Sequence, residues 1–67
     1  MINISLNGEL KTIKESTPLS NAMLAWGFSE KKCAVAVNGE FVPRENYKSV
    51  TLNNNDEVDV VAPVGGG

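Results

Sequence analysis

TPLSNAMLAWGF, residues 17–28, reads as an amphipathic helix with a start signal and a stop signal. Thr17 is a favoured N-cap residue, and Pro18 suits the first helical position because its ring presets a helical φ. Gly27 can adopt the left-handed conformation that ends a helix, after which Phe28 can pack back on the last turn. We expect one apolar stripe of the helix to be buried against a sheet, formed by Leu19, Ala22, Met23 and Trp26.

A β-hairpin is predicted before this helix. Residues 2–6 alternate between apolar and polar side chains, as a half-buried strand does. Asn7-Gly8 follows at once and is a strong signal for a two-residue hairpin turn, so residues 10–13 form the returning strand. Leu10 and Ile13 are three positions apart and cannot share one face of a regular strand. We therefore expect a bulge or an early end there.

A second hairpin and a last strand are predicted after the helix. Residues 34–37 form an apolar run typical of a central strand that is covered on both faces. Asn38-Gly39 is another hairpin turn, and residues 40–42 form the short return. Pro43 then ends the pairing because proline has no amide hydrogen to donate. The remaining pattern predicts a minor strand at 50–52, a turn at 53–56, and a last strand marked by Val58, Val60 and Val61.

Together these elements predict an α+β fold. A hairpin, a crossover helix, a second hairpin and a last strand build one sheet with one helix on one face. A right-handed crossover lets the last strand lie beside the first and parallel to it. This is the β-grasp (ubiquitin-like) roll, with about five strands in a mixed sheet and one main helix. We expect it to occupy residues 1–62, and residues 63–67 to form a flexible C-terminal glycine tail.

Composition limits the classes of function. The chain has 67 residues, enough for one domain, and a net charge of −2 at pH 7. The absence of a basic run argues against a nucleic-acid partner. No apolar stretch is long enough to span a membrane, and the N-terminus lacks a signal-peptide pattern. The sequence therefore predicts a cytoplasmic protein.

The chain lacks the residues of a self-contained active site. It has one cysteine, Cys33, and no histidine, so neither a zinc-type ligand set nor a bound cofactor is expected. Cys33 is either a reactive thiol or a small apolar residue leading into a buried strand. The second interpretation is favoured because no base is placed to activate the thiol. Without the commonest acid–base group, we do not expect an enzyme.

The last residues of the chain suggest a different kind of site. Val64-Gly65-Gly66-Gly67 contains three residues that add nothing to a core and are costly to order. The run is either a frayed end or a leash that carries the Gly67 carboxylate into a narrow slot of another protein. Phe41, Val61 and Val64 would form an apolar docking patch on the uncovered sheet face, unless Phe41 and Val61 belong to the core.

Residues 37–47, VNGEFVPRENY, together with Gly65-Gly66-Gly67, resemble the ThiS family of ubiquitin-like sulfur carriers in thiamin biosynthesis. The family pattern is similar to V-N-x-x-x-V-P-R-x-x-W ahead of a diglycine end, and the resemblance covers essentially the whole chain. There are two departures from the pattern. Tyr47 stands where the family usually has tryptophan, and three glycines stand where two are the common minimum.

The resemblance implies chemistry that is performed by partner enzymes. A ThiF-type activating enzyme would use ATP to adenylate the Gly67 carboxylate, and a cysteine desulfurase system would supply the sulfur that converts it to a thiocarboxylate. A ThiG-type thiazole synthase would then take that sulfur. Arg44 either contacts a partner or is a solvated turn residue paired with Glu45 or Glu40, and exposed pairs contribute little to stability.

Other interpretations use the same terminus. The small subunit of molybdopterin synthase shares the fold and the tail, and carriers for cysteine synthesis or tRNA thiolation are also possible. A ubiquitin-like protein modifier would be joined to lysines through Gly67, whereas a plain binding module would carry the glycines incidentally. The sequence alone leaves the acceptor protein open.

Overall fold

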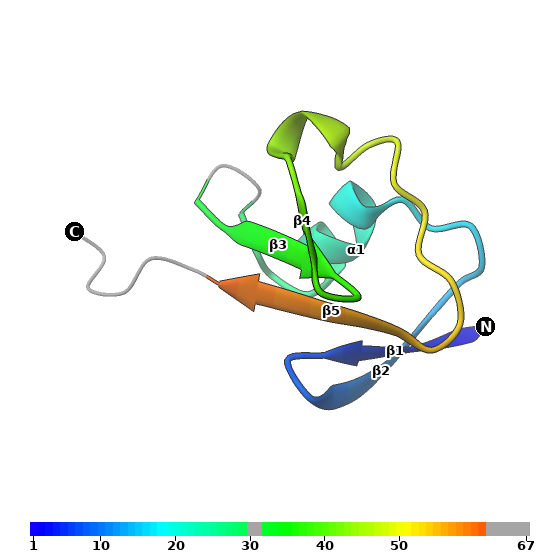
Figure 1. The fold of residues 1–67 in the computed structure, drawn as a ribbon. Coiled ribbons are helices and arrows are strands. Elements are labelled where there is room, and N and C mark those ends of the chain that lie inside the picture. Colours follow the sequence, from blue (N-terminus) through cyan, green and yellow to red (C-terminus); the bar gives the residue numbers. More distant parts are fainter. Residues whose placement is uncertain (30–31, 62–67) are drawn as a thin grey trace.

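The structure is a computed structural model and describes residues 1–29 and 32–61 (Figure 1). Its elements follow the order β1 (Ile2–Leu6), β2 (Glu9–Ile13), α1 (Leu19–Ala25), β3 (Ala34–Val37), β4 (Glu40–Val42), the 3₁₀ helix η1 (Arg44–Asn46) and β5 (Asp56–Val61). The strands form one sheet in the order β2-β1-β5-β3-β4. β1 and β5 are parallel, and the other neighbours are antiparallel. The predicted β-grasp roll is confirmed.

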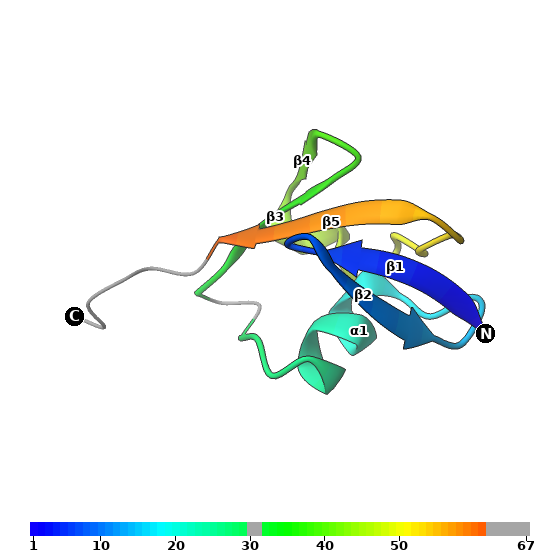
Figure 2. The same ribbon diagram turned by 90° about the horizontal axis from the view of Figure 1, so that it is seen from below.

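Helix α1 packs against one face of the sheet, and the opposite face is open (Figure 2). Alternate strand residues therefore point into the core. The core consists of Ile2, Ile4, Leu6, Ile13, Leu19, Ala22, Met23, Val35, Val42, Tyr47, Leu52, Val58 and Val60. Trp26, predicted to be buried, is only partly buried against this cluster. It is the C-cap residue of α1, directly after the last helical residue, Ala25.

The helix N-terminus is closed by a distant segment rather than by the predicted cap. Pro18, not Thr17, is the N-cap residue, and no side chain caps the helix. The Thr17 hydroxyl instead donates to the Lys14 carbonyl at 2.7 Å. The free amides of the first turn donate to carbonyls of the chain after η1: Leu19 to Val50 at 2.7 Å and Ser20 to Tyr47 at 3.1 Å. A side-chain cap is unnecessary because these contacts satisfy the same donors.

The helix C-terminus follows the prediction. Gly27 has a φ of +87°, the left-handed conformation in which a side chain would be strained. The Phe28 amide donates to the Met23 carbonyl at 2.9 Å, and the Gly27 amide donates to the Leu24 carbonyl at 3.1 Å. These two bonds form a Schellman motif.

The predicted bulge in the first hairpin is absent. The register of β1 and β2 runs without interruption from Ile2↔Ile13 to Leu6↔Glu9. Ile13 points into the core, whereas Leu10 lies opposite Ser5 on the other face and is 73% exposed. The odd spacing of the two residues reflects opposite faces of a regular strand.

Two further predictions about strands were wrong. β3 is not the doubly covered central strand, because β5 occupies the centre and the first β3 residue, Ala34, is exposed. Residues 50–52 form no strand, and only an isolated bridge pairs Thr51 with Pro18. The turn predicted at 53–56 ends earlier, because Asp56 already begins β5.

Candidate functional site: the open sheet face and the end of β5

The predicted site begins where β5 ends. β5 is held by β1 from Ile4↔Asp56 to Leu6↔Val58, and by β3 from Val37↔Val58 to Ala34↔Val61. Several predictions lie outside the described residues. They are the domain boundary at residue 62, the tail at 63–67 with its flexibility, and the candidate residues Val64, Gly65, Gly66 and Gly67. The structure therefore defines the platform that precedes the tail, ending at Val61.

An apolar patch lies on the open face beside this end of β5. Phe41 is 68% exposed and Val61 is 67% exposed, which excludes the alternative that they belong to the core. Strand pairing places Phe41 opposite Ala36 and Val61 opposite Ala34, so the four side chains share one face. We call these four residues the apolar patch. A docking role for it remains a prediction.

The centre of the open face is acidic. Glu57 and Asp59 are exposed, and they alternate with the buried Val58 and Val60 along β5. Asp59 lies opposite Ala36, next to the apolar patch. By strand register, no lysine or arginine of the five strands points to this face within the described residues. The face therefore combines apolar side chains with two negative charges.

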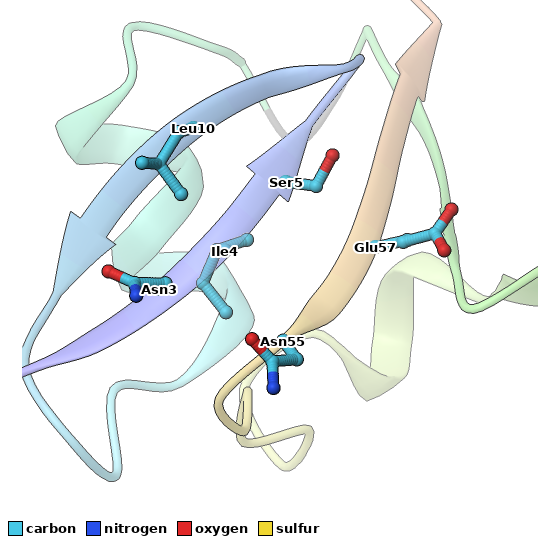
Figure 3. A pocket seen from close by; sticks show the side chains of 6 residues that line it. All are labelled: Asn3, Ile4, Ser5, Leu10, Asn55 and Glu57. Carbon is cyan, nitrogen blue, oxygen red and sulfur yellow. The ribbon is translucent and has the colours of Figure 1, made fainter.

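A shallow depression lies at the opposite end of β5 from Val61. Figure 3 shows the residues that line it, which come from β1, β2, β5 and the turn before β5: Asn3, Ile4, Ser5, Leu10, Asn55 and Glu57. Leu10 is the exposed apolar side chain of this group. Its position extends the apolar character of the open face to β2, beyond the residues that the sequence singled out.

Arg44 is separate from this face in the chain. It is exposed and lies in η1, after the end of β4, rather than in a strand of the sheet. Both of its interpretations, partner contact and solvated turn residue, stay predictions.

Cys33 is a free cysteine that is partly buried against the core. Its carbonyl accepts a hydrogen bond from the Tyr47 hydroxyl at 3.3 Å. This placement fits the interpretation of Cys33 as a packing residue. Across residues 1–29 and 32–61, no group of three or more histidine, cysteine, aspartate or glutamate side chains could hold a metal ion.

Sequence reasoning missed two further contributions to the site. Leu10 lies on the open face, and its odd spacing from Ile13 is also consistent with this outward position on a regular strand. The two Asn-Gly patterns predict Asn7 and Asn38 only as turn residues, yet both of their side chains bind β5. No sequence pattern distinguishes such an asparagine from one that only forms the turn.

Within the described part of the chain, no helix has the length and apolar character needed to cross a membrane.

Comparison with known proteins decides the family. The model of the ThiS family matches residues 4–67, which is nearly the whole chain and includes the glycine run. The chain belongs to the ThiS family. The crystal structure of a thiamine biosynthesis protein (ThiS) from Geobacter metallireducens is similar, with a TM-score of 0.83 and 28% identity. The similarity covers 98% of this chain and 100% of the Geobacter ThiS chain.

Two longer relatives are named thiazole synthase. The protein of Magnetococcus marinus is 36% identical over 66 residues, and that of Paramagnetospirillum magneticum is 32% identical over 66 residues. Each match covers 98% of this ThiS-family chain but 20% of the relative. The chain thus spans about a fifth of the length of these curated relatives.

Proposed function

We propose that this chain is a sulfur carrier for thiazole formation in thiamin biosynthesis, and that the α-carboxylate of Gly67 is the group that carries the sulfur. The observation that supports this most strongly is the ThiS family match, which runs through the β-grasp body to Gly67. The same match favours the thiazole pathway over the small subunit of molybdopterin synthase.

The proposed chemistry takes place in partner proteins. A carboxylate is a poor electrophile, so a ThiF-type enzyme first joins the Gly67 carboxylate to AMP from ATP, and pyrophosphate leaves. The outer sulfur of a persulfide formed by a cysteine desulfurase system then attacks the acyl adenylate and displaces AMP, which gives an acyl disulfide. A second thiol cleaves the S–S bond of this intermediate, so that the thiocarboxylate is released and a disulfide is formed between the two thiols. The chain is a co-substrate in these steps and is not an enzyme.

A ThiG-type thiazole synthase is the proposed acceptor of the sulfur. The two relatives named thiazole synthase each contain a segment similar to nearly this whole chain. A carrier-like segment within a thiazole synthase supports an interaction between carrier and synthase.

The open sheet face is the proposed docking surface for the activating enzyme. Partner interfaces commonly centre on exposed apolar side chains, which the apolar patch supplies next to the end of β5. The six residues after Val61 reach at most about 20 Å when fully extended. That reach allows the carboxylate to enter a pocket while the sheet stays docked outside. We place the protein in the cytoplasm, where its activating enzyme has ATP.

The test is intact-mass measurement after co-expression with a ThiF-type enzyme and a cysteine desulfurase. We expect the mass gain that corresponds to replacing one oxygen by sulfur. A covalent conjugate with another protein would indicate a modifier, and an unchanged mass would indicate a plain binding module. Offering the loaded carrier either a ThiG-type thiazole synthase or another acceptor then tests the remaining classes of sulfur carrier.

Two variants of the terminus assign the chemistry to Gly67. Deleting Gly67 shortens the reach by about 3.5 Å and leaves another glycine at the end. Appending one alanine lengthens the reach by about 3.5 Å and adds a Cβ at the reacting residue. In a narrow slot the added alanine is expected to lower the loading rate more, because its Cβ must also enter the slot, whereas the deletion leaves a terminal glycine without a side chain. Cys33→Ser is the control, and loss of loading in that variant would contradict the assignment.

A further inference from the structure

The two hairpin turns do more than reverse the chain. Asn7 and Asn38 are the first residues of their turns, with φ values of +50° and +52°. Such values suit the type I′ turn, in which asparagine is favoured because its side chain tolerates the left-handed region. In both turns the asparagine side chain also binds the backbone of β5. Each turn therefore holds β5, the strand that precedes the tail, through side-chain hydrogen bonds.

Asn7 forms hydrogen bonds with the C-terminal part of β5. The paired register of β1 and β5 ends at Leu6↔Val58, and the Asn7 amide donates to the Val58 carbonyl at 2.9 Å. Beyond this point β1 turns away into the hairpin. Val60 is two residues after Val58, so its amide and carbonyl face the same side, where no further β1 residue can pair with them.

The Asn7 side chain takes the place of the missing strand residue. Its Oδ1 accepts from the Val60 amide at 2.8 Å, and its Nδ2 donates to the Val60 carbonyl at 3.2 Å. Both bonds are partly buried. One side chain thus satisfies the last donor and the last acceptor that β5 presents on its β1 side within the described residues. Figures 1 and 2 show the β1–β2 turn beside this part of β5.

Asn38 forms a similar set of hydrogen bonds at the other end of β5. Its amide donates to the Glu57 carbonyl at 2.7 Å, and its Oδ1 accepts from the Glu57 amide at 2.9 Å. Its Nδ2 donates to a carboxylate oxygen of Asp56 at 3.0 Å. The two asparagines are alike in turn type and bonding, but only Asn7 acts next to the point where the chain leaves the sheet.

We propose that Asn7 is a positioning residue for sulfur loading. Its side chain fixes the backbone of β5 at Val60, and thereby the direction in which the residues after Val61 leave the docking face. This inference rests on the proposed function. Without the two hydrogen bonds of the Asn7 side chain, Val60 and Val61 are held by β3 alone. The Gly67 carboxylate then approaches the active site of the activating enzyme from a wider range of directions. Docking itself is unaffected, because Asn7 lies outside the apolar patch.

The experiment compares Asn7→Gly with Asn38→Gly. Glycine adopts the positive φ of both turns, so each substitution keeps the turn and removes the side-chain hydrogen bonds to β5. For Asn7→Gly we expect kcat of thiocarboxylate formation by the ThiF-type enzyme to fall about tenfold, with KM unchanged and faster amide hydrogen exchange at Val60. Both glycine variants should lower the melting temperature by similar amounts, but Asn38→Gly should leave kcat and KM unchanged. Asn7→Asp, which keeps an acceptor for the Val60 amide, should recover part of kcat.

The outcomes separate this inference from the proposed function. If the unaltered chain forms no thiocarboxylate, the proposed function fails and the positioning role fails with it. If the unaltered chain loads and Asn7→Gly loads with the same kcat, only the positioning role is overturned. Equal losses of kcat in the two glycine variants, or a loss confined to KM, would also overturn it.

Discussion

Tyr47 connects three parts of the molecule. Its side chain is 1% exposed, and its hydroxyl donates to the Cys33 carbonyl just before β3. Its own carbonyl accepts from the Ser20 amide in α1. A tyrosine suits this position because the ring fills the core while the polar tip finds a partner. The burial of Tyr47 supports a packing role for the aromatic residue at this position.

Replacing Tyr47 by phenylalanine tests the hydroxyl alone. We expect Tyr47→Phe to lower the free energy of unfolding by about 1 kcal/mol, because the Cys33 carbonyl loses a donor while the ring still fills its space. Urea denaturation followed by Trp26 fluorescence measures this difference. Phe41→Leu is the control at an exposed position and should leave the midpoint unchanged. A Tyr47→Phe variant as stable as the unaltered chain would contradict the assigned contribution.

At the scale of elements, β5 has two different faces. Its inward residues complete the core, whereas Glu57, Asp59 and Val61 lie on the open face. An apolar and acidic surface is complementary to a partner surface that carries apolar and basic side chains. A positive charge in place of Val61 would therefore remove an apolar contact and repel the basic side chains of such a partner.

Val61→Lys is expected to weaken binding to the activating enzyme at least tenfold, the effect of losing a central contact at an interface. Leu24→Lys is the matched control, because Leu24 is 68% exposed on α1, away from the sheet face. Both variants should melt within a few degrees of the unaltered chain, since exposed substitutions change stability by about 0.5 kcal/mol or less. Titration calorimetry and thermal melts give the two readouts. Equal binding by the two variants would place the docking surface elsewhere.

At the scale of the molecule, stability depends on one small core. A domain of this size is only marginally stable, so the loss of a single large buried side chain is a substantial fraction of the total. Consecutive helix residues provide a direct comparison, because Met23 is fully buried and Leu24 is exposed.

Met23→Ala is expected to lower the free energy of unfolding by about 2–5 kcal/mol, and Leu24→Ala by less than about 0.5 kcal/mol. Both changes introduce the same good helix former, so helix propensity does not explain the difference. Chemical denaturation at fixed temperature measures it. Similar losses in the two variants would show that the helix is oriented differently from the structure.

The sequence predicted the fold because its strongest signals are local. Alternation in residues 2–6, two Asn-Gly turns and the Gly27 helix end each specify a backbone conformation without help from the rest of the chain. It failed where distant segments decide the outcome. The amides of Leu19 and Ser20 are satisfied by residues 47–50, so Thr17 is not needed as a cap. The parallel pairing of β5 with β1 was predicted from the crossover, but its pairing with β3, which makes β5 the central strand, is a long-range contact that no local pattern contains.

The candidate site was predictable in a similar way. The exposure of Phe41 and Val61 follows from strand alternation once one sheet face is known to be open. The exposure of Leu10 is not predicted, because its spacing from Ile13 is equally consistent with a bulge. The second role of Asn7 depends on the end of a ladder between strands that are far apart in sequence.

The placement of β5 also affects how the protein is made. β5 alone joins the β1–β2 half of the sheet to the β3–β4 half, so a nascent chain that stops before Asp56 carries two hairpins with no common strand. Isolated hairpins are marginal in water, and the sheet can close only after the ribosome has delivered almost the whole domain. A prematurely ended chain therefore stays unfolded and open to proteases. Only a chain translated through its last strand presents a docking face to an activating enzyme.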